Sequence, residues 1–124
     1  MKVLLSIKPE FVKKIFDGTK KYEFRKTLFK RNGVSIVVIY ASAPIKRVVG
    51  EFEIDNVLSD NVDSVWEQTR NFSGITKEFY QSYFYQKKIA NAIQIGNIVK
   101  FDKYKTLSDY KINQAPQSFC YISE

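Results

Sequence analysis

The sequence predicts an α+β fold: a small mixed β-barrel with a short helix after the first strand and a helical insertion before the last strands. Three observations predict it. Apolar residues alternate with polar ones near both ends and in the middle of the chain. Two stretches, residues 9–17 and 60–85, carry apolar residues at helical spacing instead. The length of 124 residues fits one domain, residues 1–124. The pattern alone leaves many barrel topologies open.

The first elements are a strand and a short helix. Val3, Leu5 and Ile7 alternate with other residues and predict the first strand. Pro9 follows, where the first turn of a helix tolerates proline, and Gly18 supplies a C-terminal cap. The helix is therefore short, about two to three turns, and its apolar face consists of Phe11, Val12, Ile15 and Phe16.

Residues 20–26 predict a second strand, with Tyr22 and Phe24 on one face and Glu23 and Arg25 on the other. Two residues apart on a strand, Glu23 and Arg25 share a face and offer a ligand one acceptor and one donor group.

Further strands follow a turn at Asn32-Gly33. Residues 34–41 form an almost unbroken β-branched run typical of a buried strand, which Pro44 ends. Residues 48–55 alternate and predict a half-buried strand.

Residues 60–85 switch to helical spacing. Asp60 is a suitable N-cap for one helix and Thr76 for a second. The chain then returns to strands over residues 88–94 and 98–104, with a turn predicted at Gly96-Asn97. Residues 105–118 are expected to form an ordered loop, and residues 119–122 a closing strand.

The charge is distributed unevenly along the chain. The formal net charge is +7, and residues 1–47 hold twelve Lys and Arg against three Asp and Glu. The rest of the chain holds eight against ten, so the excess of positive charge belongs to the first part. Such asymmetry favours a surface that binds a polyanion, most simply nucleic acid. The alternative is an ordinary solvated, lysine-rich surface.

Composition also excludes several chemistries. With no histidine, the chain has no Ser-His-Asp triad, no His-ligated zinc and no imidazole base. Its single cysteine, Cys120, excludes an internal disulfide and agrees with a reducing compartment. No apolar run approaches the roughly 20 residues that span a bilayer. We therefore expect a cytoplasmic protein with no membrane partner, metal or cofactor.

The most informative segment runs from Gly18 to Arg25. It resembles the G-x-K-x-x-E-x-R motif of the ASCH family, with Gly18, Lys20, Glu23 and Arg25 at the four specified positions. Like the family motif, it follows a strand, a proline and a short helix. The A-P-Q-S-F ending at residues 115–119 and the middle strands around residues 40–52 also resemble a bacterial single-domain ASCH subgroup.

This resemblance implies a PUA-like barrel whose basic cleft binds RNA or a modified nucleotide. Carried over to this chain, the expected nucleic-acid or ligand-binding residues are Lys8, Lys20, Glu23, Arg25, Ser42, Gln117 and Ser118. Lys20 can neutralise a phosphate, Glu23 can accept from a base amino group, and Arg25 can bind phosphate or a carbonyl edge. Without the family context, an ordinary Glu23–Arg25 surface ion pair is the simpler interpretation. DNA in place of RNA stays open.

The resemblance also leaves catalysis open, because some ASCH proteins are enzymes. A metal-independent ribonuclease can use Lys20 to stabilise the phosphorane charge and Glu23 as the base for the 2′-hydroxyl. The family's amidohydrolase branch fits less well, because its threonine nucleophile falls where this chain has Glu23. A third hypothesis is a protein-interaction module whose basic face docks an acidic partner.

Overall fold

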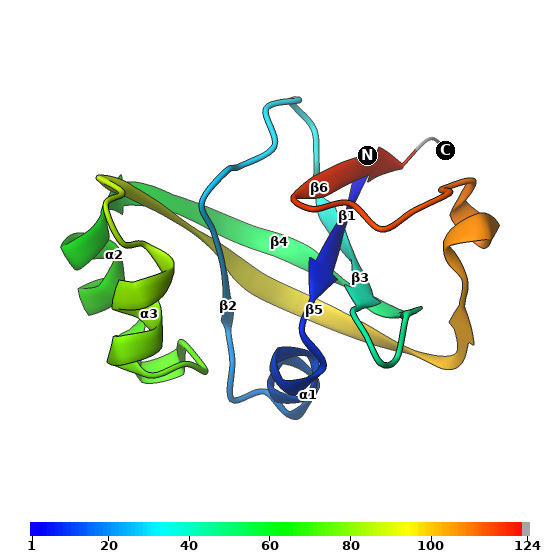
Figure 1. Cartoon of the computed structure of the whole chain (residues 1–124), viewed down its shortest axis with the longest axis horizontal. Helices are drawn as coiled ribbons and strands as arrows, with labels where there is room; N and C mark the ends of the chain where they lie inside the picture. The colour runs from blue at the N-terminus through cyan, green and yellow to red at the C-terminus, as the bar shows by residue number, and fades with distance from the viewer. Residues whose placement is uncertain (123–124) are drawn as a thin grey trace.

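The computed structural model describes residues 1–122 and contains one six-stranded mixed sheet with the strand order β2-β5-β4-β3-β1-β6 (Figure 1). The strands are β1 (Lys2–Ile7), β2 (Tyr22–Arg25), β3 (Ile36–Ala41), β4 (Arg47–Asn61), β5 (Ile89–Lys105) and β6 (Phe119–Ile122). The helices are α1 (Pro9–Asp17), α2 (Val62–Thr69) and α3 (Lys77–Tyr83), with short 3-10 helices at Arg70–Phe72 and Leu107–Tyr110. The predicted α+β class is therefore confirmed. Among the described residues no ladder joins the edge strands β2 and β6, so the sheet is not closed into a strict barrel.

The sheet is mixed because β1 connects to β3 through the α1–β2 crossover. β1 pairs in parallel with β3 and antiparallel with β6, and the remaining neighbours are antiparallel. β4 and β5 form a long ribbon, and α2 and α3 lie in the connection at one of its ends (Figure 1). α1 lies below the sheet in that view, at the end of β1.

The short helix forms as predicted. Pro9 occupies its first turn, and Gly18 ends it at φ 84°, where its N–H bonds back to the carbonyls of the last turn. α1 buries Val12 and Ile15 against the sheet, in a cluster that includes Leu5, Val37, Ile39 and Phe52. A second cluster lies under α2 and α3 and contains Phe24, Val65, Tyr80 and Phe84. The two clusters fix the helices on either side of β2.

Three details differ from the sequence-based expectation. Gly96 and Asn97 form no turn: they lie inside the continuous strand β5, where the register shifts because these two residues stand opposite the single residue Glu53 of β4. The cap of α2 is Asn61 rather than Asp60, since the Asn61 side chain accepts from the Ser64 amide. The loop over residues 105–118 includes the 3-10 helix at Leu107–Tyr110, which Thr106 and Asp109 cap reciprocally.

Over residues 1–122, no helix combines the length and apolar character needed to cross a membrane.

Candidate functional site

A cleft of about 160 Å³ opens beside β2, between α1 and α3. Three segments build it: the end of β1 with the start of α1, the stretch from residue 20 to 25, and the stretch from residue 75 to 83. It is lined by Ser6, Ile7, Lys8, Phe11, Lys20, Glu23, Phe24, Arg25, Ile75, Phe79 and Tyr83. Four of the seven binding residues predicted from the sequence are therefore together here: Lys8, Lys20, Glu23 and Arg25.

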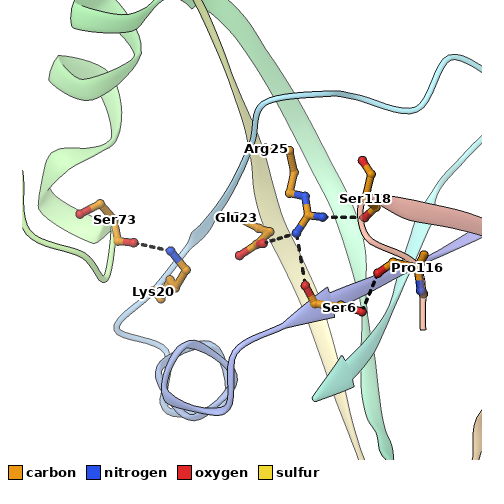
Figure 2. A network of polar contacts seen from close by, with 7 residues as sticks. All are labelled: Ser6, Lys20, Glu23, Arg25, Ser73, Pro116 and Ser118. Atoms are coloured by element: carbon orange, nitrogen blue, oxygen red, sulfur yellow. Dashed lines mark hydrogen bonds and ion pairs between the residues drawn. The ribbon is translucent and has the colours of Figure 1, made fainter. Parts of the chain in front are cut away.

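Lys20 is the most unusual residue of the cleft, because it is a lysine with only 2 % of its surface exposed. Its Nζ donates a hydrogen bond of 2.7 Å to the carbonyl oxygen of Ser73 (Figure 2). The same ammonium lies 5.2 Å from the ring centre of Phe11 and 4.9 Å from that of Phe24. Burial lowers the pKa of Lys20 from 10.5 to about 8, although the nearby Glu23 carboxylate opposes the shift.

The turn at Ser73 and Gly74 holds Lys20 in place. Gly74 has φ +70°, a left-handed conformation that glycine adopts without steric cost. Lys14 of α1 also donates to the Gly74 carbonyl at 2.9 Å, so two lysines from the α1 region bind the same turn. The turn lies about fifty residues along the chain from the motif, and no local sequence signal connects the two.

Glu23 and Arg25 form a buried ion pair of 3.2 Å, with side chains that are 7 % and 12 % exposed. β2 pairs antiparallel with β5, and this register directs both side chains to the same side of the strand. Arg25 also donates to the carbonyl oxygens of Ser6 at 3.3 Å and Ser118 at 2.5 Å (Figure 2). The guanidinium thus orients Glu23 and at the same time ties β2 to β1 and to the segment before β6. The pair is not an ordinary exposed surface bridge.

Aromatic rings form the wall opposite α1. Phe79 and Tyr83, one turn apart on α3, stack with their centroids 6.4 Å apart and an interplanar angle of 11°. Cations lie over both rings: Lys8 is 5.5 Å from the Phe79 centroid and Lys26 is 4.7 Å from that of Tyr83. Burial raises the pKa of Tyr83.

The sequence did not single out Phe11 and Phe79 as site residues. It offered Tyr83 only as one of several aromatic residues that could stack on a base, because aromatic residues at such spacings usually belong to a core.

The other three predicted residues lie outside the cleft lining. Ser42 is in the turn after β3, where its amide bonds to the Ile7 carbonyl. Gln117 is exposed, and Ser118 reaches Arg25 through its backbone carbonyl. The segment that carries them is fixed near the cleft by Arg25 and by the Ser6 hydroxyl, which donates to the Pro116 carbonyl at 3.2 Å. No described group of three His, Cys, Asp or Glu side chains is arranged to bind a metal ion.

Comparison with known proteins found relatives in sequence and in fold. The sequence pattern of the ASCH domain matches residues 5–99 of this chain. The crystal structure of ASCH from Zymomonas mobilis is similar in fold, with a TM-score of 0.89 over 99% of this chain and 88% of that chain, at 24% identity. A curated ASCH domain-containing ribonuclease from the same organism is 25% identical over 122 residues, which cover 96% of this chain and 82% of the relative.

Two longer proteins of Ureaplasma parvum also contain a similar segment. The large ribosomal subunit protein uL22 is 29% identical over 120 residues, and the ATP synthase subunit alpha is 30% identical over 121 residues. In each case 97% of this chain is matched. The chain spans only 39% of the first protein and 15% of the second.

Proposed function

Since this chain belongs to the ASCH domain family, we propose that it binds RNA and takes one base or modified nucleotide into the cleft beside β2. The observation that carries the proposal is the cleft itself. Lys20, Glu23 and Arg25 are brought together there, inside a wall of aromatic rings. Single-stranded RNA is recognised in this way, by stacking of splayed-out bases on aromatic side chains and by hydrogen bonds to their edges.

The size of the cleft supports a single ring as the occupant. Its volume of about 160 Å³ is close to that of an engineered protein cavity of about 150 Å³ that binds benzene. An oligonucleotide does not fit such a space, whereas one base that has left its stack does. Phe79 and Tyr83 provide the faces against which the base would pack.

The polar groups of the cleft favour a base edge with an acceptor next to a donor. The Lys20 ammonium has three N–H donors, of which the structure uses one for Ser73. The Glu23 carboxylate accepts from Arg25 and retains further acceptor capacity for an amino or imino group. At the rim, Lys8 and Lys26 are exposed and suited to phosphate contacts.

Fluorescence-polarisation binding of a labelled single-stranded RNA, at two salt concentrations, tests this function. A gel of the same samples reports whether the RNA stays intact. We expect salt-sensitive binding by the wild type and at least about tenfold weaker binding by Lys20→Met and Glu23→Gln, since each loses a contact to a base or phosphate. Lys30→Ala, which changes an exposed lysine between β2 and β3 that does not line the cleft, is the matched control and should change the affinity little.

Binding to no RNA above background would contradict the proposal and favour an acidic protein partner. Equal affinity for the matching DNA would show that the site does not select for the 2′-hydroxyl.

A second candidate function, metal-independent cleavage of RNA, has its own observation. Lys20 and Glu23 line the same cleft within electrostatic reach of each other, and the pKa of Lys20 is lowered to about 8. The relative in Zymomonas mobilis is also named a ribonuclease. In this reaction Glu23 takes the 2′-hydroxyl proton and the 2′-oxygen bonds to phosphorus. The bond to the 5′-oxygen breaks, and that oxygen takes a proton from water. The Lys20 ammonium stabilises the phosphorane charge.

The gel separates the two functions. Cleavage by the wild type that is lost in both Lys20→Met and Glu23→Gln would support the ribonuclease. Cleavage that persists in both variants would come from another site or from a contaminant, and RNA that remains intact in every sample would leave binding as the function.

A further inference from the structure

Helix α1 separates the cleft from a second groove. The groove has a volume of about 390 Å³ and is lined by Pro9, Val12, Lys13, Phe16, Asp17, Ile45, Val49, Lys100 and Tyr104. It lies between α1, the turn before β4 and the C-terminal part of β5, on the side of α1 away from α3 (Figure 1). None of the RNA contacts proposed above uses it.

The same two residue types, a lysine and a phenylalanine, lie on both sides of α1. Lys8, the extended residue just before the helix, and Phe11 line the cleft, and the same pair of residue types recurs five positions later as Lys13 and Phe16, which line the groove. With roughly 3.6 residues per turn, the five positions from Phe11 to Phe16 turn the side chain by about 140° around the axis. The two phenylalanines therefore project to different flanks of one helix.

The groove has a floor and a rim suited to a nucleotide chain. Gly50 lets the Phe16 ring lie against the sheet, since a Cβ at this position would come within 2.9 Å of the ring. Lys100 lies 5.7 Å from the Phe16 ring centre, and Tyr104 is half exposed at the rim. These residues offer aromatic faces together with cations, the combination that binds single-stranded nucleic acid.

The charge of the groove favours an anion. Two exposed lysines, Lys13 and Lys100, face one carboxylate, Asp17. Asp17 accepts hydrogen bonds from the amide and hydroxyl of Thr19, at 2.9 and 2.6 Å, so its oxygens are already partly engaged. An adjoining hollow shares Lys100 and Tyr104 and adds Lys103, which extends the cationic surface along β5.

We propose that this groove is a second RNA subsite, in which a strand that places one base in the cleft continues across α1 and binds with its neighbouring nucleotides. The inference rests on the proposed RNA binding. It adds the path of the bound strand, from the cleft across α1 to the groove, and the minimum length of RNA that fills both subsites. The two subsites are separated by the width of a helix, about 10 Å with side chains. A mononucleotide therefore reaches only the cleft, whereas an oligomer of several nucleotides reaches both.

The test compares Lys13→Ala/Lys100→Ala with Lys30→Ala/Lys88→Ala, a matched control that removes two exposed lysines from other parts of the surface. Affinities are measured for a ribonucleoside monophosphate and for a labelled 12-nucleotide RNA at several salt concentrations. We expect the groove variant to bind the 12-mer at least tenfold more weakly and the monophosphate within twofold of the wild type. The slope of log affinity against log salt should fall by about 1.4, since each phosphate contact to a single strand contributes roughly 0.7.

The control double variant should lose no more than twofold for either probe. Two results would overturn the second subsite and leave the cleft proposal standing. One is that both double variants lose the same affinity for the 12-mer. The other is that the groove variant loses as much affinity for the monophosphate as for the 12-mer. Failure of the wild type to bind either probe would overturn both. Concentration-dependent dimerisation that is lost in the groove variant would show that a second copy occupies the groove instead of RNA.

Discussion

The side chain of Lys20 packs directly against the Cα of Gly74, so closely that a Cβ at position 74 would lie 2.6 Å from both Lys20 Cβ and Lys20 Cγ. The Ser73 carbonyl, one residue earlier, accepts the hydrogen bond from the same lysine. The turn thus contacts Lys20 along its stem and at its head. This contact fixes a buried cation in the wall of the cleft.

We expect Gly74→Ala to destabilise the protein and to weaken RNA binding. The left-handed backbone alone costs about 1–2 kcal/mol with an L side chain, and the clash with the Lys20 stem adds about 1–3 kcal/mol. Gly33→Ala is the matched control, since Gly33 has a similar φ of +82° with nothing within 4 Å of the added Cβ. Denaturant unfolding and polarisation binding measure both effects. Equal losses of stability in the two variants would argue against a tight Lys20–Gly74 contact.

Lys20→Met is expected to raise the free energy of unfolding at pH 7 while it abolishes tight RNA binding. A buried ammonium opposes folding, and a pKa lowered from 10.5 to about 8 corresponds to a cost on the order of 3 kcal/mol. The lost hydrogen bond to Ser73 and the lost contacts with Phe11 and Phe24 reduce the net gain to about 1–2 kcal/mol. Denaturant unfolding at pH 7 checks this. A destabilised variant would indicate that Lys20 is retained for the fold and not for a ligand.

The pH dependence of stability follows from the same shift. Between pH 8 and 10.5 the unfolded chain holds a proton on Lys20 that the folded chain has released, so the Lys20 contribution to the unfolding free energy rises with pH through this window. Below pH 8 the lysine is protonated in both states and its unfavourable contribution is complete. The difference in stability between Lys20→Met and the wild type should therefore shrink from pH 8 to pH 10. A constant difference would contradict the buried state of Lys20.

RNA binding should change with pH in the opposite direction. The Lys20 ammonium, which we propose to contact the ligand, is fully charged near pH 6 and half neutral near pH 8. We expect the affinity for an oligomer of adenosine and cytidine to fall several-fold from pH 7 to pH 9, and the residual binding of Lys20→Met to change little. An affinity that stays constant in the wild type over this range would show that the Lys20 charge does not contribute.

Arg25 is expected to stabilise the sheet in addition to lining the cleft. Arg25→Ala leaves Glu23 as a buried charge without its partner and removes the bonds to Ser6 and Ser118, so we expect a loss of about 3–5 kcal/mol. Hydrogen exchange should then speed up in β6. Arg31→Ala is the control: Arg31 also reaches β6, through the Tyr121 ring at 4.3 Å, yet it is exposed, and we expect a loss of no more than about 1 kcal/mol. Similar losses in both variants would contradict the special role of Arg25.

The sequence predicted the parts of the fold that depend on local signals. Pro9 and Gly18 delimit α1, and Thr76 caps α3, because proline, glycine and threonine act through their own backbone or their nearest turn. Gly96-Asn97 gave the wrong prediction for the same reason: the pair is a common turn signal, but here β5 pairs with β4 on both sides of it, at Ile95 and at Ile98. Tertiary pairing decided that segment.

The site was predictable only in part. The motif placed Glu23 and Arg25 on one face, and the structure brings them to 3.2 Å. The burial of Lys20 depends on Ser73 and Gly74, which no periodicity links to the motif. The aromatic wall of Phe79 and Tyr83 was hidden among residues that fit a core equally well.

Amide NMR shifts during titration with ribonucleoside monophosphates test the central claim most directly. The account predicts that the largest shifts fall on the three segments that line the cleft, residues 6–11, 20–25 and 75–83, and that they disappear in Lys20→Met. Residues 30–33, in the loop at the opposite end of the sheet, should not move. Shift changes concentrated in other residues would contradict the cleft as the nucleotide site, and so would the absence of any shift change at millimolar ligand.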